Sequence, residues 1–412
     1  MKSTVVKMIS ILLCAVMLAG SAVEAFAAET AVPENSYPYV FVHGMMGWGE
    51  NTEGAMMNGP YWGFNADNDV PAYLRGLGYE VAVPSVGPMS SAWDRACELY
   101  AQLTGTRVDY GAAHSEAHGH ARFGRDYTNR AVLNNGAGWD MTTPVNIVTH
   151  SFGGPTAIVF ASVMEYGVPE EVDAAPGDCS EFFRGGKKGL VHSVSTLASP
   201  HNGSPLSNLL YDIKLPVFLA AFIMNVADNG TDYMFDQFGI TEDPALGEKA
   251  KFNFGGIMAL YKSDDHCAYD MTIKGARELV QRFPAASGTY YFSYSGDITE
   301  DGKLGRKVTK DFASGIFGIT GSILTMCAGK RFNGVKLGAE WAANDGFVPV
   351  VSAMYPFGQQ HTDYVPDAQL VPGVWYVMPT TPGGSHGYHV GGQAQTLHAF
   401  YDSMTAVVNA IG

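Results

Sequence analysis

A serine between a strand pattern and a helix pattern is the strongest candidate for chemistry in this sequence. The apolar run 145–148 leads into Ser151, and a helix-period stretch begins at residue 155. A serine hydroxyl is a useful nucleophile only when it is exposed, aimed at a carbonyl and deprotonated by a neighbour. A tight strand-to-helix turn aims it, and small residues two positions before and after relieve crowding. Those positions hold Thr149, where glycine is usual, and Gly153. The pattern Thr-x-Ser-x-Gly predicts that Ser151 is an acyl-transfer nucleophile.

Acyl transfer passes through a tetrahedral intermediate, whose negative oxygen needs two backbone N–H donors. We expect one donor to be the amide of Phe152, directly after the nucleophile. The second should come from the loop after an early strand, and segment 43–48 follows such a strand. Gly44 and Gly47 let this loop turn its amides inward, which makes the amide of Met45 the predicted second donor.

The general base must be a histidine. When the nucleophilic serine lies on a strand-to-helix turn, the order of the three residues along the chain is Ser, acid, His. Of the twelve histidines, His386 and His389 lie late in the sequence, in the glycine-rich segment 383–392. His398 falls inside the closing helix pattern, where a packed or surface role is expected. The candidate acid is Asp345, on an Asn-Asp-Gly turn. That tripeptide is also an ordinary turn sequence, and spacing alone leaves both histidines open as the base.

A separate cluster of metal-ligating residue types lies earlier in the chain. Asp94 stands in a Trp-Asp-Arg-Ala-Cys stretch, and segment 114–120 contains three histidines. Two carboxylates and two neutral imidazoles would suit a four-coordinate divalent metal such as zinc. Histidine clusters are more often solvated or hydrogen-bonded, and the spacing alone leaves both interpretations open.

The elements that must position these residues alternate between strand and helix. Short β-branched and aromatic runs predict strands at 39–42, 80–83, 145–148, 191–197 and 290–294, with a weaker one at 374–377. Helix periodicity appears at 156–166, 273–283 and 396–411. Near-continuous apolar strands that alternate with helices predict a mostly parallel sheet covered on both faces. Two segments exceed this pattern, 88–139 and 202–281, and the second contains an apolar helix candidate at 216–227.

The N-terminus has the pattern of an export signal. Lys2 and Lys7 precede an apolar run at 8–18, and Ala25-Phe26-Ala27 fits a signal-peptidase site. The run is shorter than the roughly 20 residues that span a bilayer. We therefore expect a signal peptide at 1–27, a mature chain from near Ala28 without a transmembrane segment, and one domain over 28–412.

Composition bounds the class of protein. Hydrophobic residues make up 46% of the chain and charged residues 16%, which predicts a large core. A formal charge of −15 gives no general attraction to nucleic acid. The four cysteines of the mature chain are too few for a disulfide-built scaffold, although one pair could bridge. These four are Cys97, Cys179, Cys267 and Cys327.

Motifs spread over nearly the whole mature chain carry a family resemblance. They lie at 37–48, 91–100, 109–125, 194–203, 235–239, 344–346 and 373–375. With these motifs the sequence resembles the secreted lipases of thermophilic bacilli and their staphylococcal relatives. The resemblance implies an α/β-hydrolase fold with a zinc-binding insertion, at about 88–139, and a lid region, at about 202–281. The apolar stretch 216–227 falls where the family keeps its lid.

The resemblance also implies roles for individual residues. Ser151, Asp345 and His386 match the nucleophile, acid and base of the family, and Met45 and Phe152 match the oxyanion donors. Four residues match the ligands of a structural zinc ion: Asp94, His114, His120 and Asp236.

The family's calcium site is not predicted here. The residue before the base is Ser385 instead of aspartate, and Tyr388 replaces a calcium-ligating carboxylate. The loop that follows is shortened and lacks acids. The same rearrangement keeps His389 as a rival base.

The expected function is that of an extracellular lipase or carboxylesterase. It would hydrolyse acylglycerols or other lipid esters at a lipid–water interface through an acyl-enzyme. The alternatives are a phospholipase or acyltransferase with the same triad, a metal-dependent hydrolase centred on 114–120, and a non-catalytic lipid-binding relative.

Overall fold

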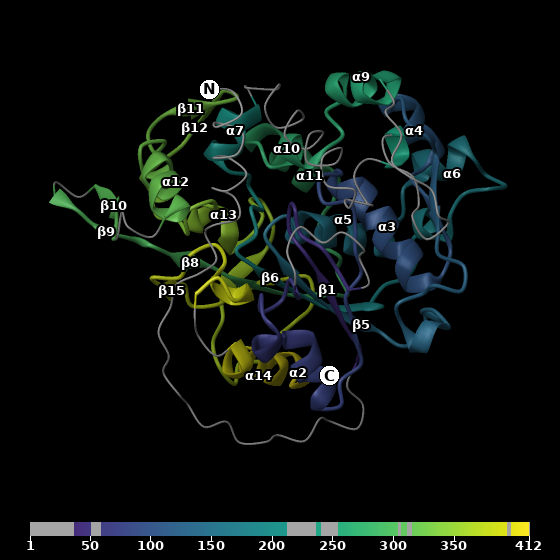
Figure 1. The fold of residues 1–412 in the computed structure, drawn as a ribbon, viewed down its shortest axis with the longest axis horizontal. Helices are drawn as coiled ribbons and strands as arrows, with labels where there is room; N and C mark the ends of the chain where they lie inside the picture. The colour runs from purple at the N-terminus through teal and green to yellow at the C-terminus, as the bar shows by residue number, and fades with distance from the viewer. Residues whose placement is uncertain are drawn as a thin grey trace.

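A parallel sheet forms the centre of the molecule (Figure 1). The computed structural model describes residues 37–50, 59–211, 236–239, 254–303, 306–310, 315–393 and 397–411. The expected signal peptide, 1–27, and the apolar stretch 216–227 lie outside the described residues. Among the described residues, no helix is both long and apolar enough to span a membrane.

Within the described residues the sheet has seven strands in the order β13-β14-β7-β6-β5-β1-β2, and each pairing is parallel. Its strands are β1 (Tyr39–Val42), β2 (Val81–Ala82), β5 (Val145–His150), β6 (Val191–Leu197), β7 (Tyr290–Tyr294), β13 (His361–Asp363) and β14 (Trp375–Val377). The predicted parallel α/β architecture is confirmed. Only β13 was not predicted, because its three residues are all exposed and lack an apolar run.

Both faces of the sheet are buried, as the continuous apolar strands require. In β1, Val40 and Val42 point into one core cluster, whereas Tyr39 and Phe41 point into the other. The first cluster lies under α3 (Ala92–Thr104) and α5 (Gly153–Tyr166), which pack on each other. The second lies under α2 (Val70–Gly76) and α14 (Leu397–Asn409), seen together below the sheet in Figure 1.

The predicted insertion, 88–139, begins with a helix that belongs to the core. Every residue of α3 from Ala92 to Leu103 is buried. Beyond α3 the segment forms an antiparallel ribbon, β3 (Arg107–Asp109) with β4 (Phe123–Asp126), and a short helix between them, α4 (Ala112–His118). α3 therefore connects the sheet to this outer part.

The remaining elements lie around this frame. The helices are α6 (Pro169–Ala174), α7 (Pro205–Tyr211), α9 (Phe254–Lys262), α10 (Cys267–Asp270), α11 (Ile273–Arg282), α12 (Ile316–Thr325) and α13 (Val350–Met354). The short strands are β8 (Gly296–Asp297), β9 (Thr299–Asp301), β10 (Lys307–Thr309), β11 (Arg331–Phe332), β12 (Val335–Lys336) and β15 (Thr381–Pro382). The 3-10 turns are η2 (Ala66–Asn68), η3 (Asn134–Gly136), η4 (Glu181–Arg184), η5 (Asp236–Phe238), η8 (Ala339–Trp341) and η9 (Tyr388–Val390). The four cysteines of the expected mature chain are buried free thiols.

Candidate active site and metal cluster

Ser151 lies on a strained turn between β5 and α5. Its φ angle is +53°, a left-handed conformation that side chains other than glycine rarely adopt. The Ser151 amide donates to the Leu197 carbonyl at 2.9 Å, which fixes the turn to β6. A Cβ on Gly153 would lie 2.4 Å from the Val42 carbonyl oxygen, so the turn needs glycine there. Residues held in such strained conformations cluster at functional sites.

The loop after β1 passes directly beside this turn. β1 and β5 are neighbours, with Val42 opposite Thr149, so the segments that follow them meet at one edge of the sheet. A Cβ on Gly44 would lie 2.8 Å from the Cβ of Ser151. The predicted oxyanion donors, Met45 and Phe152, thus belong to the two segments that flank the Ser151 side chain.

Arg95 of α3 holds both of these segments. Its buried guanidinium donates to the carbonyls of His43 and Gly44, the second at 3.4 Å. It also lies over the ring of Phe152, 5.1 Å from the centroid. Burial lowers the pKa of Arg95 to about 10, so the side chain remains a cation at neutral pH. One buried positive charge therefore supports both halves of the candidate oxyanion hole.

The predicted acid and base meet at Ser151. His386 Nε2 lies 2.9 Å from Ser151 Oγ, and His386 Nδ1 lies 2.9 Å from Asp345 Oδ2. The other carboxylate oxygen of Asp345 accepts from the amides of Phe347 and Val348, at 2.9 and 2.7 Å. These bonds orient the carboxylate, and the carboxylate orients the imidazole. The structure thus brings together all three residues of the predicted triad.

The rival base, His389, faces elsewhere. Its Nε2 lies 3.5 Å from Thr381 Oγ1, and its ring is fully buried. Burial, with the nearby His386, lowers the pKa of His389 to about 3, so it remains neutral. The third late histidine, His398, stacks on Tyr73 with ring centroids 3.8 Å apart, which agrees with a packing role.

The loop that carries His386 is closed by a side-chain amide. Gln393 Oε1 accepts from the Ser385 amide at 2.9 Å and from the Ser385 hydroxyl at 3.1 Å. Gln393 Nε2 donates to the Gly383 carbonyl at 3.2 Å. Residues 380–393 include no acidic side chain. The donors in this loop therefore do not fit calcium, which prefers several charged oxygen ligands.

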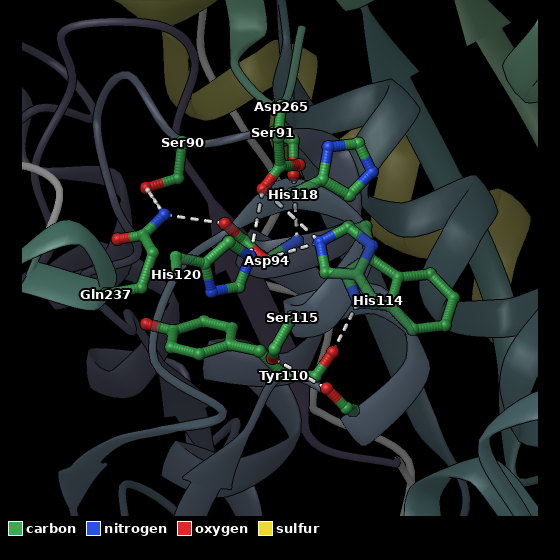
Figure 2. A network of polar contacts seen from close by, with 12 residues as sticks. Ser90, Ser91, Asp94, Tyr110, His114, Ser115, His118, His120, Gln237 and Asp265 are labelled. Carbon is green, nitrogen blue, oxygen red and sulfur yellow. Dashed lines mark hydrogen bonds and ion pairs between the residues drawn. The ribbon is translucent and has the colours of Figure 1, made fainter. Parts of the chain in front are cut away.

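A buried cluster of two carboxylates and two imidazoles lies at the start of α3 and beside α4. It consists of Asp94, His114, His120 and Asp265, whose donor atoms all lie within 4.8 Å of one another. Asp265 Oδ2 is 3.2 Å from Nε2 of both histidines, and Asp94 Oδ1 is 3.3 Å from His114 Nε2. Figure 2 shows the four side chains converging. Such a donor set is typical of a tetrahedral zinc site.

Electrostatics within the cluster favour a bound cation. Burial would raise the pKa of Asp265, but His114 and His120 hold that pKa well below its usual range. Burial and the charge of Asp265 raise the pKa of Asp94. Burial opposes protonation of His114, yet the two carboxylates raise its pKa to about 10. Among the residues that the structure describes, the buried atoms Asp94 Oδ1 and His120 Nε2 have no hydrogen-bond partner. A divalent cation would satisfy these atoms and offset the carboxylate charges.

Hydrogen bonds around the cluster orient its members. His120 Nδ1 lies 2.8 Å from the Ala121 carbonyl, so the Nδ1–H donates outward and Nε2 faces the centre. The buried carboxylate of Glu171 accepts from the amides of Ala113 and His114, at 2.9 and 2.8 Å. These bonds fix the first turn of α4 and with it the His114 side chain.

One predicted ligand, Asp236, stays a prediction. Asp236 begins η5, and its side chain lies outside what the structure describes. The same turn does reach the cluster, but through Gln237, whose Nε2 donates to Asp94 Oδ2 at 2.6 Å. The second carboxylate of the cluster is that of Asp265. Among the described residues, the candidate set is therefore Asp94, His114, His120 and Asp265.

Sequence reasoning missed Asp265 because it lies 151 positions after His114, its partner in the cluster. A local signal was present in the stretch Ser-Asp-Asp-His at 263–266, just before α10. A pair of acids in a segment with little surrounding charge is a candidate for ligation. Tyr61 and His150, which contact the candidate site, were also not singled out.

Comparison with known proteins finds lipases among the proteins similar to this chain. It is 33% identical over 368 residues to Lipase 2 of Staphylococcus aureus, which covers 87% of this chain and 51% of that protein. This chain thus spans about half the length of that relative. The crystal structure of Staphylococcus hyicus lipase matches with a TM-score of 0.77 and 29% identity, over 91% of this chain and 97% of that one. The structure of EstA from Clostridium botulinum matches with a TM-score of 0.74 and 28% identity, over 92% and 88%.

The family assignment rests on a match that extends beyond any single motif. The model of the family described as "Lipase-like, C-terminal domain" matches residues 35–408. That range contains the strained serine turn, the acid, the base and the metal cluster. The resemblance to staphylococcal lipases inferred from the sequence is confirmed, and the chain belongs to the lipase-like, C-terminal domain family.

Proposed function

We propose that the protein is a serine ester hydrolase that cleaves lipid esters, as a lipase or carboxylesterase. One observation carries the proposal: the continuous hydrogen-bonded series from Asp345 through His386 to Ser151, with both contacts at 2.9 Å. The strained turn at Ser151 and the names of the lipase relatives support it.

The proposed mechanism follows from the donors and acceptors present. His386 Nε2 removes the proton from Ser151 Oγ as the oxygen attacks the ester carbonyl carbon. The C=O π electrons move to the oxygen, which the amides of Met45 and Phe152 stabilise. The protonated His386 then gives its proton to the leaving alcohol as the C–O bond breaks. Water, deprotonated by the same imidazole, releases the acid and restores Ser151.

The cluster of Asp94, His114, His120 and Asp265 is proposed to hold a structural zinc ion. Four protein donors would fill a tetrahedral shell, which leaves no coordination position for substrate or water. When bound, the metal would supply a cross-link between α3, α4 and the segment before α10. Because protein donors would fill every coordination position, the site argues against a metal-dependent hydrolase centred on the histidine-rich segment 114–120.

The substrate is proposed to be an acylglycerol or another neutral lipid ester at a lipid–water interface. Low charge content and an acidic net charge of −15 favour neutral, apolar partners over nucleic acid or anionic surfaces. The N-terminal signal pattern supports secretion. We also propose that residues 28–412 fold as one domain, with the regions 88–139 and 202–281 serving the metal site and the lid.

The test is Ser151→Ala with a series of p-nitrophenyl esters of increasing chain length. We expect turnover to fall by about 10⁴-fold or more while the fold is retained. Wild-type protein should also incorporate one equivalent of a serine-directed phosphonate. A Ser151→Ala protein that hydrolyses these esters at the wild-type rate would refute the proposal. Unlabelled, inactive wild-type protein would instead indicate a non-catalytic lipid-binding relative, and activity on phospholipids alone would indicate a phospholipase.

A further inference from the structure

A buried hydrogen-bonded chain joins the loop after β1 to the backbone of His386. The Gly44 amide donates to Tyr61 Oη at 3.1 Å, and Tyr61 Oη lies 2.6 Å from His150 Nδ1. His150 Nε2 lies 2.8 Å from the His386 carbonyl oxygen. Tyr61, His150 and His386 are all buried. None of these contacts belongs to the Asp345–His386–Ser151 series.

The direction of every proton in this chain is fixed by its two ends. The His386 carbonyl can only accept, so His150 Nε2 must carry a proton. A neutral imidazole then presents Nδ1 as an acceptor, and Tyr61 must donate to it. The Tyr61 oxygen is left to accept from the Gly44 amide, which can only donate. Burial, together with the neighbouring His386, lowers the pKa of His150 well below its usual range, so the neutral form that this pattern needs is maintained.

The hydrogen-bonded chain, together with Asp345, holds the backbone of His386 on both sides. The His386 amide donates to the Asp345 carbonyl at 2.8 Å, so the acid holds one side of the residue's backbone. His150 holds the other side through the carbonyl oxygen. The imidazole of His386 must keep contacts of 2.9 Å with both Ser151 and Asp345, which a backbone shift of a few tenths of an ångström would lengthen.

The other end of the chain restrains the candidate oxyanion loop. The peptide unit between His43 and Gly44 is held at its oxygen by Arg95 and at its N–H by Tyr61. The next peptide unit carries the Met45 amide. The Gly44 oxygen of that unit lies 2.8 Å from His43 Nδ1. The chain thus begins one residue before a proposed oxyanion donor and ends on the proposed base.

We propose that Tyr61 and His150 are positioning residues that lock the oxyanion loop and the His386 backbone in one geometry. The proposal rests on the proposed function, because it assigns Tyr61 and His150 a role in the same reaction. It adds two residues to those that support the reaction. Neither Tyr61 nor His150 is proposed to contact the reacting atoms of the substrate. Their effect should be on turnover, because the geometry that they hold matters most in the transition state.

The test compares variants that remove single links. Tyr61→Phe removes one hydroxyl and should lower kcat about tenfold, because it leaves a buried Nδ1 without a partner. His150→Phe removes both links and should lower kcat about 10²-fold, the usual effect of misplacing a reacting group by about 1 Å. His150→Gln restores a donor near the Nε2 position and should recover most of that loss. KM should change by less than about twofold in each variant, because the substitutions leave the contacts with bound substrate in the ground state unchanged.

The matched control is Tyr401→Phe. Tyr401 is also buried, and its hydroxyl donates to the carbonyl of His389 at 2.9 Å, three positions from the base. The control removes the same atom from the same region without touching the chain to Gly44. It should lower the melting temperature about as much as Tyr61→Phe while kcat stays near wild type.

Two results would overturn this assignment. Equal kcat losses in Tyr61→Phe and Tyr401→Phe would reduce Tyr61 to a packing residue. Equal losses in His150→Gln and His150→Phe would show that the donated hydrogen bond does not matter. If His150→Phe fails to fold, the comparison of kcat between Tyr61→Phe and Tyr401→Phe still tests whether Tyr61 is a positioning residue. Either of these two results would leave the wild-type protein reactive with a phosphonate. If the proposed function itself were wrong, the phosphonate would not label the wild-type protein.

Discussion

Replacing Asp265 with asparagine tests the proposed metal cluster. Asparagine keeps the size of the side chain but removes the negative charge that lies 3.2 Å from His114 and His120. A neutral amide is a poor zinc ligand, so the variant should lose most of its metal. The matched control is Asp236→Asn, which changes the ligand that the family resemblance implies; this variant should keep its zinc.

The size of the effect follows from binding linkage. A ligand present at about 100 times its Kd stabilises the folded state by about 2.7 kcal/mol. Unfolding entropy of about 2 cal/mol/K per residue gives about 0.8 kcal/mol/K for a chain of this length. Loss of the metal should therefore lower the melting temperature by about 3 °C, and by more for tighter binding.

The assay is elemental analysis of purified protein followed by a thermal melt, for wild type and both variants. We expect about one equivalent of zinc in wild type and in Asp236→Asn. Zinc loss in Asp236→Asn with full retention in Asp265→Asn would restore the original assignment and refute the geometric argument. Zinc below about half an equivalent in wild type would make the four residues a hydrogen-bonded polar cluster.

Three further predictions concern the base, acid stability and the support of α4. His386→Ala should lower turnover of a p-nitrophenyl ester nearly as much as loss of the nucleophile, whereas His389→Ala should cost far less; reversed losses would make His389 the base. Burial lowers the pKa of His43 and His201 to about 3, so the unfolded state binds more protons below pH 6.5. The free energy of unfolding should thus fall as pH drops, by about 2 kcal/mol per imidazole at pH 5 in urea titrations, and a flat profile would contradict this. Glu171→Ala leaves one buried and one part-buried amide without an acceptor and should cost about 3 kcal/mol in the same titration, with a loss below about 1 kcal/mol counting against its role.

Local patterns explain what could be predicted from the sequence. The strands that were predicted are β-branched or aromatic runs, buried on both faces, whose composition alone excludes most other structures. The turn at Ser151 could be predicted because strand, nucleophile and helix are contiguous. The edge strand β13 could not be predicted, since three exposed polar residues resemble a loop until β14 pairs with them.

Contacts between residues that are far apart in the sequence explain which features could not be predicted. Asp345 and His386 are separated from Ser151 by roughly two hundred residues, and only the order rule for this fold and the family resemblance connected them. The metal cluster shows the limit of that approach. Segment 235–239 matched a family motif, and its residue Gln237 lies at the cluster, where it contributes a hydrogen bond to Asp94. Proximity of a motif to a site does not identify which of its side chains is a ligand.

The two sites share one helix, which gives the metal cluster a consequence for catalysis. Asp94 and Arg95 are consecutive, fully buried residues of α3, and they leave it in different directions. Asp94 enters the metal cluster, whereas Arg95 donates to the loop after β1 and lies over Phe152. The start of α3 is also tied by Ser91, whose hydroxyl oxygen accepts from the Asp94 amide at 3.1 Å.

A rotation of α3 that releases Asp94 must therefore also move Arg95. Metal loss would act on the oxyanion loop through this helix, whereas the contacts between Ser151 and His386 arise from β5 and the loop before α14, which the metal cluster does not include. Chelation at a temperature well below the melting point should accordingly leave phosphonate labelling of Ser151 complete. Any loss should appear in kcat, where stabilisation of the oxyanion is expressed.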